Sequence, residues 1–343
     1  MSTRSFFIDR AIGETRGVVT FDGRPERLLI ARDGEDAAVA IGARSIARVK
    51  SVNRSLATAF LELPGGAPAV LGLKPDMERI TEGQAVEVEI RSEPRRGKSA
   101  AARLIGPGEG APRLLAPGAD IETELRALAR DGKLVEGLGA REAADEAEAE
   151  ALETIHPLPG GGSLAIEETR ALVAIDVDVG ERAGADSKRV TRQTNLTALY
   201  AAARLLRLKG LGGLVVVDLA GRGHDAAALL SAARVAFGPD NPGVAISPVS
   251  RFGTMELTIP RRRRPIVDLL REDSCRSAAL RLIRMLEREG RASPGARLTA
   301  ACAPEVASAA HIYESALADR LGRRFIIVAR EGWGPERLEV SAQ

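Results

Sequence analysis

The chain has 343 residues, of which 45% are hydrophobic and 28% are charged. This is the composition of a globular protein, and the length allows two or three domains. The net charge of +2 neither requires nor excludes a polyanionic partner, and an aromatic content of 3% leaves few side chains on which bases could stack.

The two cysteines, Cys275 and Cys302, lie far apart and belong to no CxxC or Cys/His cluster. We therefore expect no structural zinc site, and a free pair of thiols fits a reducing environment. The N-terminus lacks the apolar core of a signal peptide, and no segment is apolar over the length of a membrane span. The sequence thus predicts a cytoplasmic protein without a membrane partner.

The first third of the chain is predicted to consist of short strands. Residues 1–36 contain apolar runs separated by DG pairs, which are typical of hairpin turns. Several more short strands are expected over 42–105, without a convincing helix between them. This pattern favours a small β-barrel of the OB type over 37–106. The Gly/Pro-rich segment GPGEGAPRLLAPG, residues 106–118, predicts a linker after the barrel.

The rest of the chain mixes helices and strands. Residues 119–152 are rich in Ala, Glu, Leu and Arg and predict helix. From residue 163 the pattern becomes α/β, with strands SLAIEE, ALVAIDV and LVVVDL, helices near 191–208 and 224–237, and two further strand candidates, GVAISPVS and TMELTI.

A run of four arginines, RRRR at 261–264, ends this α/β region. Residues 265–290 predict an amphipathic helix that is interrupted near EDSC, and the last 50 residues predict a small α/β unit. The arginine run is a candidate RNA contact or, equally, a solvated charge run.

The two strongest strand patterns both end on an aspartate. ALVAID ends at Asp176 and GLVVVD ends at Asp218, with a helix of suitable length between them. Strands that are neighbours in sequence are often adjacent in space, so the two side chains are expected to converge. Converging carboxylates favour a hard divalent cation such as Mg²⁺, the usual ion of phosphoryl chemistry. The alternative is that each aspartate caps the following turn or helix.

The helix between these strands carries further candidates. It ends in GLGG at 210–213, which predicts glycine C-caps. Arg204 and Arg207 could face RNA phosphates, and Asn195 near the start of the helix could support a metal site. Alternatively, the two arginines form a solvated face whose long stems cover the core.

Three segments together resemble the catalytic core of the bacterial ribonuclease E/G family in order, spacing and residue types. They are GGSLAIEETRALVAIDVDVG at 161–180, TNLTALYAAARLLRLKGLGGLVVVDL at 194–219 and VSRFGTMEL at 249–257. The clear resemblance covers about 160–258, and a weaker one extends through the N-terminal 110 residues and the last 70.

This resemblance implies a multidomain α+β and α/β fold. The OB-type barrel would carry an S1 motif and be inserted near the N-terminus, and the catalytic domain would be deoxyribonuclease-I-like. The N-terminal strands at 1–36, with part of 119–155, are expected to form the remnant of a ribonuclease-H-like domain. The barrel is expected at 37–106, and a linker with an Ala/Glu-rich helical segment at 107–158. The catalytic domain is expected at 159–264 and a small C-terminal α/β domain at 265–343.

The activity implied by the resemblance is Mg²⁺-dependent cleavage of single-stranded RNA in RNA processing or decay. Asp176 and Asp218 match the two aspartates that hold the metal and thereby activate water, and Asn195 would support them. The products would carry a 5′-phosphate.

The resemblance also implies a set of RNA-binding residues. RSLATAFLEL at 54–63 resembles the S1 signature and places Phe60 at an RNA-contacting aromatic, although an aromatic in such a strand, taken alone, is more often a core residue of the barrel. A second aromatic of the family is replaced by Val70. In the hairpin EPRRGKSAAARL, Arg95 and Lys98 match basic residues, and the RNA-binding residues expected in all are Phe60, Arg95, Lys98, Arg204, Arg207 and Arg251.

The chain departs from the family pattern at several places. Asp178 stands where the family usually has Asn, and is either a third metal ligand or a disturbance; Gly221 replaces an acidic residue. No CPxC motif is present, so an oligomer would not be a zinc-bridged dimer. The short interval before the catalytic core predicts loss of the pocket that senses a 5′-monophosphate.

These departures motivate an alternative to a nuclease, a catalytically weakened RNA-binding protein of the same family. A further alternative is a different phosphoryl-transfer enzyme, or an unrelated α/β binding protein.

Overall fold

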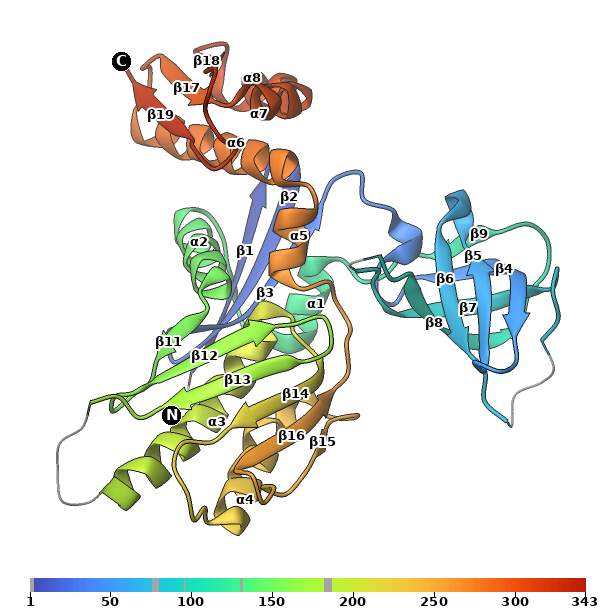
Figure 1. The fold of residues 1–343 in the computed structure, drawn as a ribbon. Helices are drawn as coiled ribbons and strands as arrows, with labels where there is room; N and C mark the ends of the chain where they lie inside the picture. Colours follow the sequence, from blue (N-terminus) through green and yellow to red (C-terminus); the bar gives the residue numbers. More distant parts are fainter. Residues whose placement is uncertain (1–2, 76–79, 96, 130–131, 182–186) are drawn as a thin grey trace.

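A computed structural model describes residues 3–75, 80–95, 97–129, 132–181 and 187–343. Over these residues the protein is a mixed α/β molecule built on several sheets. A central body holds the first and the third sheets along the chain, a barrel projects to one side, and a small C-terminal unit lies at one end (Figure 1).

The N-terminal sheet has helices on both faces. Its strand order is β10-β1-β2-β3, in which β10 is parallel to β1 and the other pairs are antiparallel. Consecutive buried residues such as Val18 and Val19 point to opposite faces, and each face packs on a helix. The elements are β1 (Arg4–Ala11), β2 (Glu14–Phe21), β3 (Arg24–Arg32), α1 (Ile121–Ala129), β10 (Leu134–Val135) and α2 (Leu138–Leu152).

A five-stranded barrel interrupts this sheet in sequence, between β3 and α1. It closes because β4 pairs with both β5 and β7, and β6 pairs with β8 in parallel. The expected linker is partly a strand, since β9 (Arg113–Ala116) adds to the edge of β4. The barrel strands are β4 (Arg44–Asn53), β5 (Thr58–Glu62), β6 (Pro68–Gly72), β7 (Ala85–Ser92) and β8 (Ala100–Pro107).

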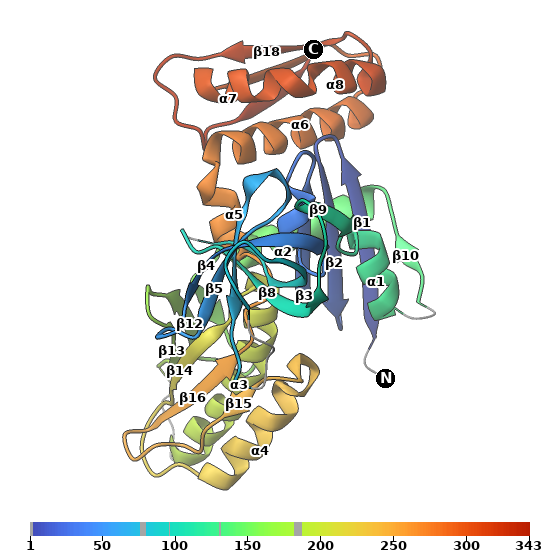
Figure 2. The ribbon, with the colours of Figure 1, turned by 90° about the vertical axis from the view of Figure 1, so that its right-hand side faces the viewer.

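The third sheet is the frame of the candidate site. Its order is β11-β12-β13-β14-β16-β15, and its parallel pair β13/β14 is joined by a helix. Helices α3 and α4 lie on one face of this sheet (Figure 2). Its elements are β11 (Ile155–Pro157), β12 (Ser163–Glu168), β13 (Val173–Asp178), α3 (Ser187–Lys209), β14 (Gly213–Asp218), α4 (Ala226–Ala236), β15 (Ala245–Ile246) and β16 (Thr254–Ile259).

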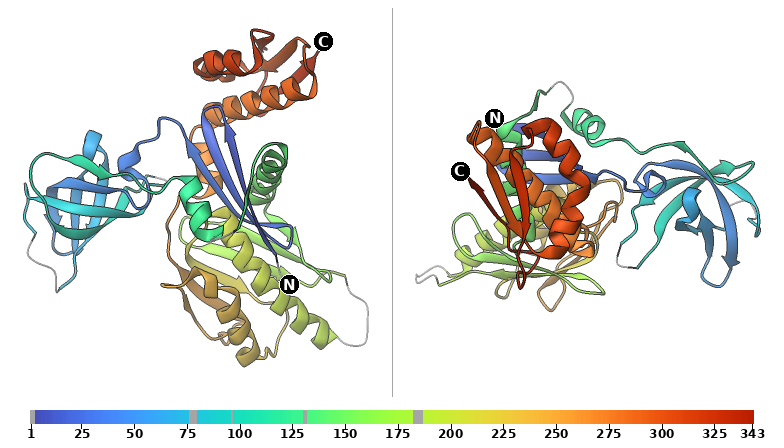
Figure 3. Two further views of the ribbon diagram at one scale, coloured as in Figure 1. Left: turned by 180° about the vertical axis from the view of Figure 1, so that it is seen from behind. Right: turned by 90° about the horizontal axis from the view of Figure 1, so that it is seen from above.

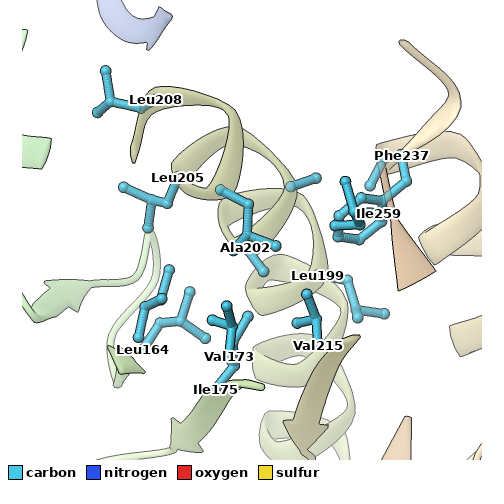
Figure 4. Close-up of a cluster of buried hydrophobic side chains, with 14 of the residues drawn as sticks. Leu164, Val173, Ile175, Leu199, Ala202, Leu205, Leu208, Val215, Phe237 and Ile259 are labelled. Atoms are coloured by element: carbon cyan, nitrogen blue, oxygen red, sulfur yellow. The ribbon is translucent and has the colours of Figure 1, made fainter. Parts of the chain in front are cut away.

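Apolar alternation fixes which way these strands face. Val173 and Ile175 of β13 and Val215 of β14 are buried and pack with Leu199 and Leu205 of α3 (Figure 4). Because side chains alternate along a strand, the residues between them are presented on the opposite face. Full burial of each such side chain is favourable by about 1.5–3 kcal/mol, which strongly fixes the register.

The C-terminal unit has its own core beyond a broken helix. The expected interruption near EDSC is confirmed, because α5 (Ile266–Glu272) ends and Asp273 caps the next helix by accepting a hydrogen bond from the Arg276 N–H. Helix α6 lies between the N-terminal sheet and a three-stranded sheet (Figure 3). The unit comprises α6 (Ser274–Ala292), β17 (Leu298–Cys302), α7 (Pro304–Ala310), α8 (Glu314–Leu321), β18 (Phe325–Ala329) and β19 (Glu339–Ala342).

Two of the sequence expectations concern the whole chain. Cys275 and Cys302 are both free thiols, and Cys302 is buried. In the part of the chain that the structure describes, every helix is too short or too polar to cross a membrane.

Candidate functional site

Asp176 and Asp218 are direct partners in the sheet. Asp218 ends β14 as expected, whereas β13 continues two residues past Asp176 to Asp178. β13 and β14 pair in parallel with Asp176 opposite Asp218, and both side chains are exposed. Directly paired residues of neighbouring strands project from the same face, about 5 Å apart at their Cα atoms. The convergence expected from the sequence is therefore confirmed for the backbone, and both aspartates belong to the face opposite α3.

Two neighbours extend this pair into a row across the sheet. Ala165 of β12 lies opposite Asp176, and Thr254 of β16 lies opposite Asp218. The Thr254 hydroxyl donates a hydrogen bond to Glu256 at 2.8 Å. The row presents its two carboxylates between a small apolar side chain and a hydroxyl that is already engaged.

Asp178 lies on the same exposed face, two residues beyond Asp176. Its carboxylate accepts a hydrogen bond from the Gly180 N–H at 3.0 Å, so it shapes the turn that leaves β13. Ser163 is its partner on β12. The pairing of β13 with β14 ends at Asp176 and Asp218, so Asp178 lies two residues beyond the end of that pairing. This local bond is what an Asx turn provides.

Asn195 fixes the loop that follows Asp218. Its amide makes two hydrogen bonds to Ala220, donating to the carbonyl and accepting from the N–H, both at 3.0 Å. Asn195 is 1% exposed, so these bonds are shielded from water. Next to it, Thr191 packs where a side chain on Gly221 would lie, and Gly221 has a φ of 79°. Asn195 acts on the site through the loop.

The chemistry of the aspartate pair suits a hard cation. Two carboxylates with open solvent around them match the way Mg²⁺ is held, by one or two carboxylates with waters completing its shell. Among the described residues, no group of three or more His, Cys, Asp or Glu side chains is arranged to hold a metal. The fit is therefore to a cation bound by two protein carboxylates and otherwise by water or phosphate.

A second feature lies where the barrel meets the sheet. A hollow of about 560 Å³ opens there, and Phe60, 41% exposed, lies on its wall opposite Val70 in the β5/β6 pair. Phe60 is thus on the barrel surface, and the core alternative for it is excluded by its exposure. The lining residues are Phe60, Val70, Ser92, Arg95, Lys98, Ser99, Ala101 and Arg261.

The hollow concentrates positive charge. Arg95 and Lys98 come from the barrel hairpin and pair with each other in a short bridge, whereas Arg261 comes from the end of β16. Burial lowers the pKa of the Arg95 guanidinium, and the positive charge of Arg261 lowers it further. Cations that disfavour one another in this way are stabilised by an anion between them.

Glycines of the GLGG segment hold Arg261 in place. The Arg261 Nε donates to the Gly212 carbonyl at 2.9 Å, and its guanidinium occupies the space that a Cβ on Gly213 would need. Gly210, with a φ of 69°, ends α3 as predicted, since the Leu211 N–H bonds back to Leu206. The lack of a side chain at Gly213 therefore leaves room for Arg261 at the hollow and is not a helix cap.

Two other arginines of the RRRR run, Arg263 and Arg264, are held in ion pairs. Arg263 pairs with Glu93 and Glu124, and Arg264 pairs with Glu35 and Glu272. The Glu93 N–H also donates to the Arg262 carbonyl at 2.8 Å. These bonds attach the barrel to the body, and the sequence alone could not separate them from the role of Arg261.

Arg204 and Arg207 face the N-terminal sheet, away from both features. Arg204 donates to the Pro25 carbonyl and pairs with Glu150. Arg207 pairs with Glu26 and Asp240. Their long stems cover the core, as the alternative for them expected, but their charges are not solvated, since they are largely buried against carboxylates.

One exposed aromatic near the aspartates was not singled out from the sequence. Phe252 is 77% exposed in the turn before β16, and the Arg251 guanidinium lies 4.8 Å from its ring centroid. Arg251 was expected at an RNA-binding position, and the structure places it in this turn. The signal that could have identified Phe252 is its position between a basic residue and a glycine, in a chain with few aromatics.

The central part of the chain is similar to proteins of a known family. Residues 120–264 match the ribonuclease E/G family. The chain is 37% identical over 124 residues to a chloroplastic ribonuclease E/G-like protein of Arabidopsis thaliana, covering 35% of this chain and 12% of that protein. Identity is 38% over 107 residues to ribonuclease E of Escherichia coli K12, covering 30% and 10%. It is 31% over 123 residues to ribonuclease G of the same strain, covering 35% and 25%.

These matches cover only part of each relative. The matched residues span between 10% and 25% of the length of those three relatives. The family match contains both aspartates, Asn195 and the turn that carries Phe252, whereas the barrel lies before it.

Proposed function

We propose that the chain is an endoribonuclease that cleaves single-stranded RNA with Mg²⁺, because its residues 120–264 match the ribonuclease E/G family. The observation that carries the proposal is the direct pairing of Asp176 with Asp218 on the exposed face of the sheet. The relatives are named as ribonucleases, and this chain retains two carboxylates where such chemistry needs them.

Each residue has a defined part in the proposed reaction. Mg²⁺, when bound, supplies an activated water and offsets the charge that develops on the phosphate, giving a product with a 5′-phosphate. Asp176 and Asp218 hold the ion at a fixed spacing because the β13/β14 register sets it. Asn195 keeps the loop after Asp218 in place, which prevents that carboxylate from drifting.

The basic hollow would bind the RNA strand at a fixed distance from the reaction. Phe60 offers a face for one base, and Arg95, Lys98 and Arg261 surround space for a phosphate. Gly213, which holds Arg261, begins β14, and Asp218 ends it. Five residues of β14, about 17 Å of extended chain, separate Gly213 from Asp218.

We also propose which domain types the barrel and the sheets represent. The barrel is of the OB type with an S1 motif, and the β11–β16 sheet with its helices is the deoxyribonuclease-I-like domain. The N-terminal sheet, in which β10 is parallel to β1, is the ribonuclease-H-like remnant that the barrel interrupts. An oligomer, if formed, needs no zinc bridge.

The test is cleavage of a single-stranded RNA under Mg²⁺. We expect Asp176→Asn and Asp218→Asn each to reduce the rate at least about 100-fold, because a metal site contributes several kcal/mol to the transition state. Asp319→Asn, an exposed aspartate of α8, is the matched control and should cleave normally.

A second candidate function rests on Asp178 and Val70, which replace the residues expected for the family. It is RNA binding by a catalytically weakened relative. Tight binding that falls with salt, together with no Mg²⁺-dependent cleavage by the wild type, would favour this candidate.

A further inference from the structure

The turn before β16 places an exposed aromatic close to the aspartate pair. Thr254 is the direct partner of Asp218, about 5 Å away at Cα, and Phe252 precedes Thr254 by two residues. Two residues span at most about 7 Å, so the Phe252 Cα lies within about 12 Å of the Asp218 Cα. This is the reach of a nucleotide next to the one being cleaved.

Ser250 makes the turn rigid. Its hydroxyl accepts hydrogen bonds from the N–H groups of Phe252 and Thr254, at 3.2 and 3.3 Å, and lies 2.8 Å from the Thr254 hydroxyl. Its carbonyl accepts from the Gly253 N–H at 3.1 Å. These hydrogen bonds fix the backbone that carries the exposed phenyl ring of Phe252.

The turn is also joined to the strand that carries Asp218. The Leu219 N–H donates to the Gly253 carbonyl at 3.2 Å, one residue after the aspartate. His224 of the following loop packs beside Gly253, and its Nε2 is buried without a hydrogen-bond partner in the described structure. The backbone of Phe252 and that of Asp218 are therefore positioned by one set of bonds.

The chemistry of the turn points to a nucleobase. Phe252 is 77% exposed, the largest fraction among the large apolar side chains found exposed, and Arg251 lies against its ring at 4.8 Å. An aromatic face accepts any base by stacking, and an arginine beside it can reach the neighbouring phosphate. A purely apolar ligand would provide no negative charge for the Arg251 guanidinium to bind.

We propose that Phe252 and Arg251 form a base-stacking platform for the nucleotide that flanks the scissile phosphate. This inference rests on the proposed function, because the occupant is the RNA of that reaction. The hollow lined by Phe60 would bind the RNA near Gly213, at the start of β14. Phe252 would bind the RNA near Asp218, at the end of β14.

The test measures binding without divalent metal, so that no RNA is cleaved. A set of single-stranded RNAs, each with one abasic position, is titrated by fluorescence anisotropy against the wild type, Phe252→Ala and Phe252→Trp. We expect Phe252→Ala to weaken binding of the intact RNA by about 5- to 150-fold and Phe252→Trp to retain it. Ile312→Ala, which removes a comparably exposed side chain in the C-terminal unit, should have no effect.

The abasic series identifies the base that stacks. One abasic position, adjacent to the cleavage site mapped with Mg²⁺, should weaken the wild type by the same factor and cost nothing further in Phe252→Ala. Equal binding by wild type and Phe252→Ala, or additive losses at every position, would overturn the platform. A change of oligomeric state in Phe252→Ala with RNA affinity intact would show a protein interface instead.

The platform and the nuclease proposal can fail separately. If coupling between Phe252 and one base is found but Mg²⁺ produces no cleavage, the platform stands on binding and the nuclease proposal fails; the coupled base is then located by its register from the 5′ end. If cleavage depends on Asp176 but no coupling is found, the platform alone is wrong.

Discussion

At the scale of single residues, Asn195 connects the packed helix α3 to the loop that follows Asp218. Replacing Asn195 with Ala removes both bonds to Ala220 and leaves a partly buried N–H and a partly buried carbonyl without these partners. We expect a stability loss of about 1–3 kcal/mol and, separately, a higher Mg²⁺ concentration for half-maximal cleavage.

The readout that separates positioning from mere stability is the Mg²⁺ dependence, measured well below the unfolding temperature. RNA affinity without metal should remain unchanged, since Asn195 does not line the hollow. Gln193→Ala, an exposed position on the same helix, serves as control. An unchanged Mg²⁺ dependence in Asn195→Ala would show that the loop does not need this clamp.

Residue identity could be predicted where the strand pattern was informative. Asp176 and Asp218 each follow an unbroken apolar run, so their pairing could be expected from the sequence, and the register confirms it. Four consecutive arginines carry no such pattern. Only their partners, Glu93 and Gly212 among them, show that Arg261 lines the hollow while Arg263 and Arg264 are bound in ion pairs.

At the scale of elements, the start of β14 controls the hollow through Gly213. A Cβ at this position would overlap the Arg261 guanidinium, and the φ of 96° is unfavourable for any other residue. We expect Gly213→Ala to weaken RNA binding and to reduce the slope of log affinity against log salt by about 0.7, the loss of one phosphate contact.

The control for backbone strain is Gly295→Ala. Gly295 has a φ of 85° with no atom near its missing Cβ, so the variant carries similar strain without a displaced side chain. Arg261→Gln should reproduce the smaller salt slope. If Gly213→Ala binds RNA like Gly295→Ala, Arg261 makes no phosphate contact.

The last turn of α3 contains a buried lysine that makes stability depend on pH. Lys209 is 4% exposed and donates to the Ala151 carbonyl at 2.9 Å and to the Glu153 carbonyl, at the end of α2. Burial lowers its pKa from 10.5 to about 8. Because the folded pKa lies below the unfolded one, the unfolded state binds more protons over this range, and stability rises with pH.

The prediction compares the wild type with Lys209→Met between about pH 7.5 and about pH 9.5. The free energy of unfolding of the wild type should rise by about 2 kcal/mol more than that of the variant, which lacks the titrating group. Denaturant unfolding at the two pH values measures this difference. Parallel pH dependence in both proteins would mean that Lys209 keeps its ordinary pKa.

Elements were predicted well where local pattern decides them, and poorly where distant partners do. The short strand β9 lies in a Gly/Pro-rich segment and exists because the β4 edge is available to pair with it. Arg204 has a partner at Pro25, far away in sequence, which no local pattern reveals. The break before α6, in contrast, follows from the capping Asp273 alone.

At the scale of the whole molecule, a buried charge network joins the N-terminal sheet, α2 and α6. Arg141, 2% exposed, pairs with Asp9 at 3.1 Å and with Glu287 at 2.9 Å. Arg284 of α6 pairs with Glu14 at 3.2 Å, and burial lowers its pKa to about 10. These pairs fix the C-terminal unit against the body.

Breaking this network should be costly. Glu287→Ala leaves the buried Arg141 with one carboxylate fewer, and we expect a loss of about 3–5 kcal/mol in the free energy of unfolding. Glu339→Ala removes an exposed partner of Arg337 and should change it by at most about 1 kcal/mol. Similar small effects in both variants would show that the contact between the C-terminal unit and the body does not depend on buried charge.

The most direct test of the central claim is a cycle of single-turnover cleavage rates for the wild type, Asp176→Asn, Asp218→Asn and the double variant. If the two carboxylates hold one cation, each single variant loses at least about 100-fold and the double variant is no slower than the slower single one, because they act as a unit. Cleavage at the wild-type rate by either single variant, or losses that multiply in the double variant, would contradict the account.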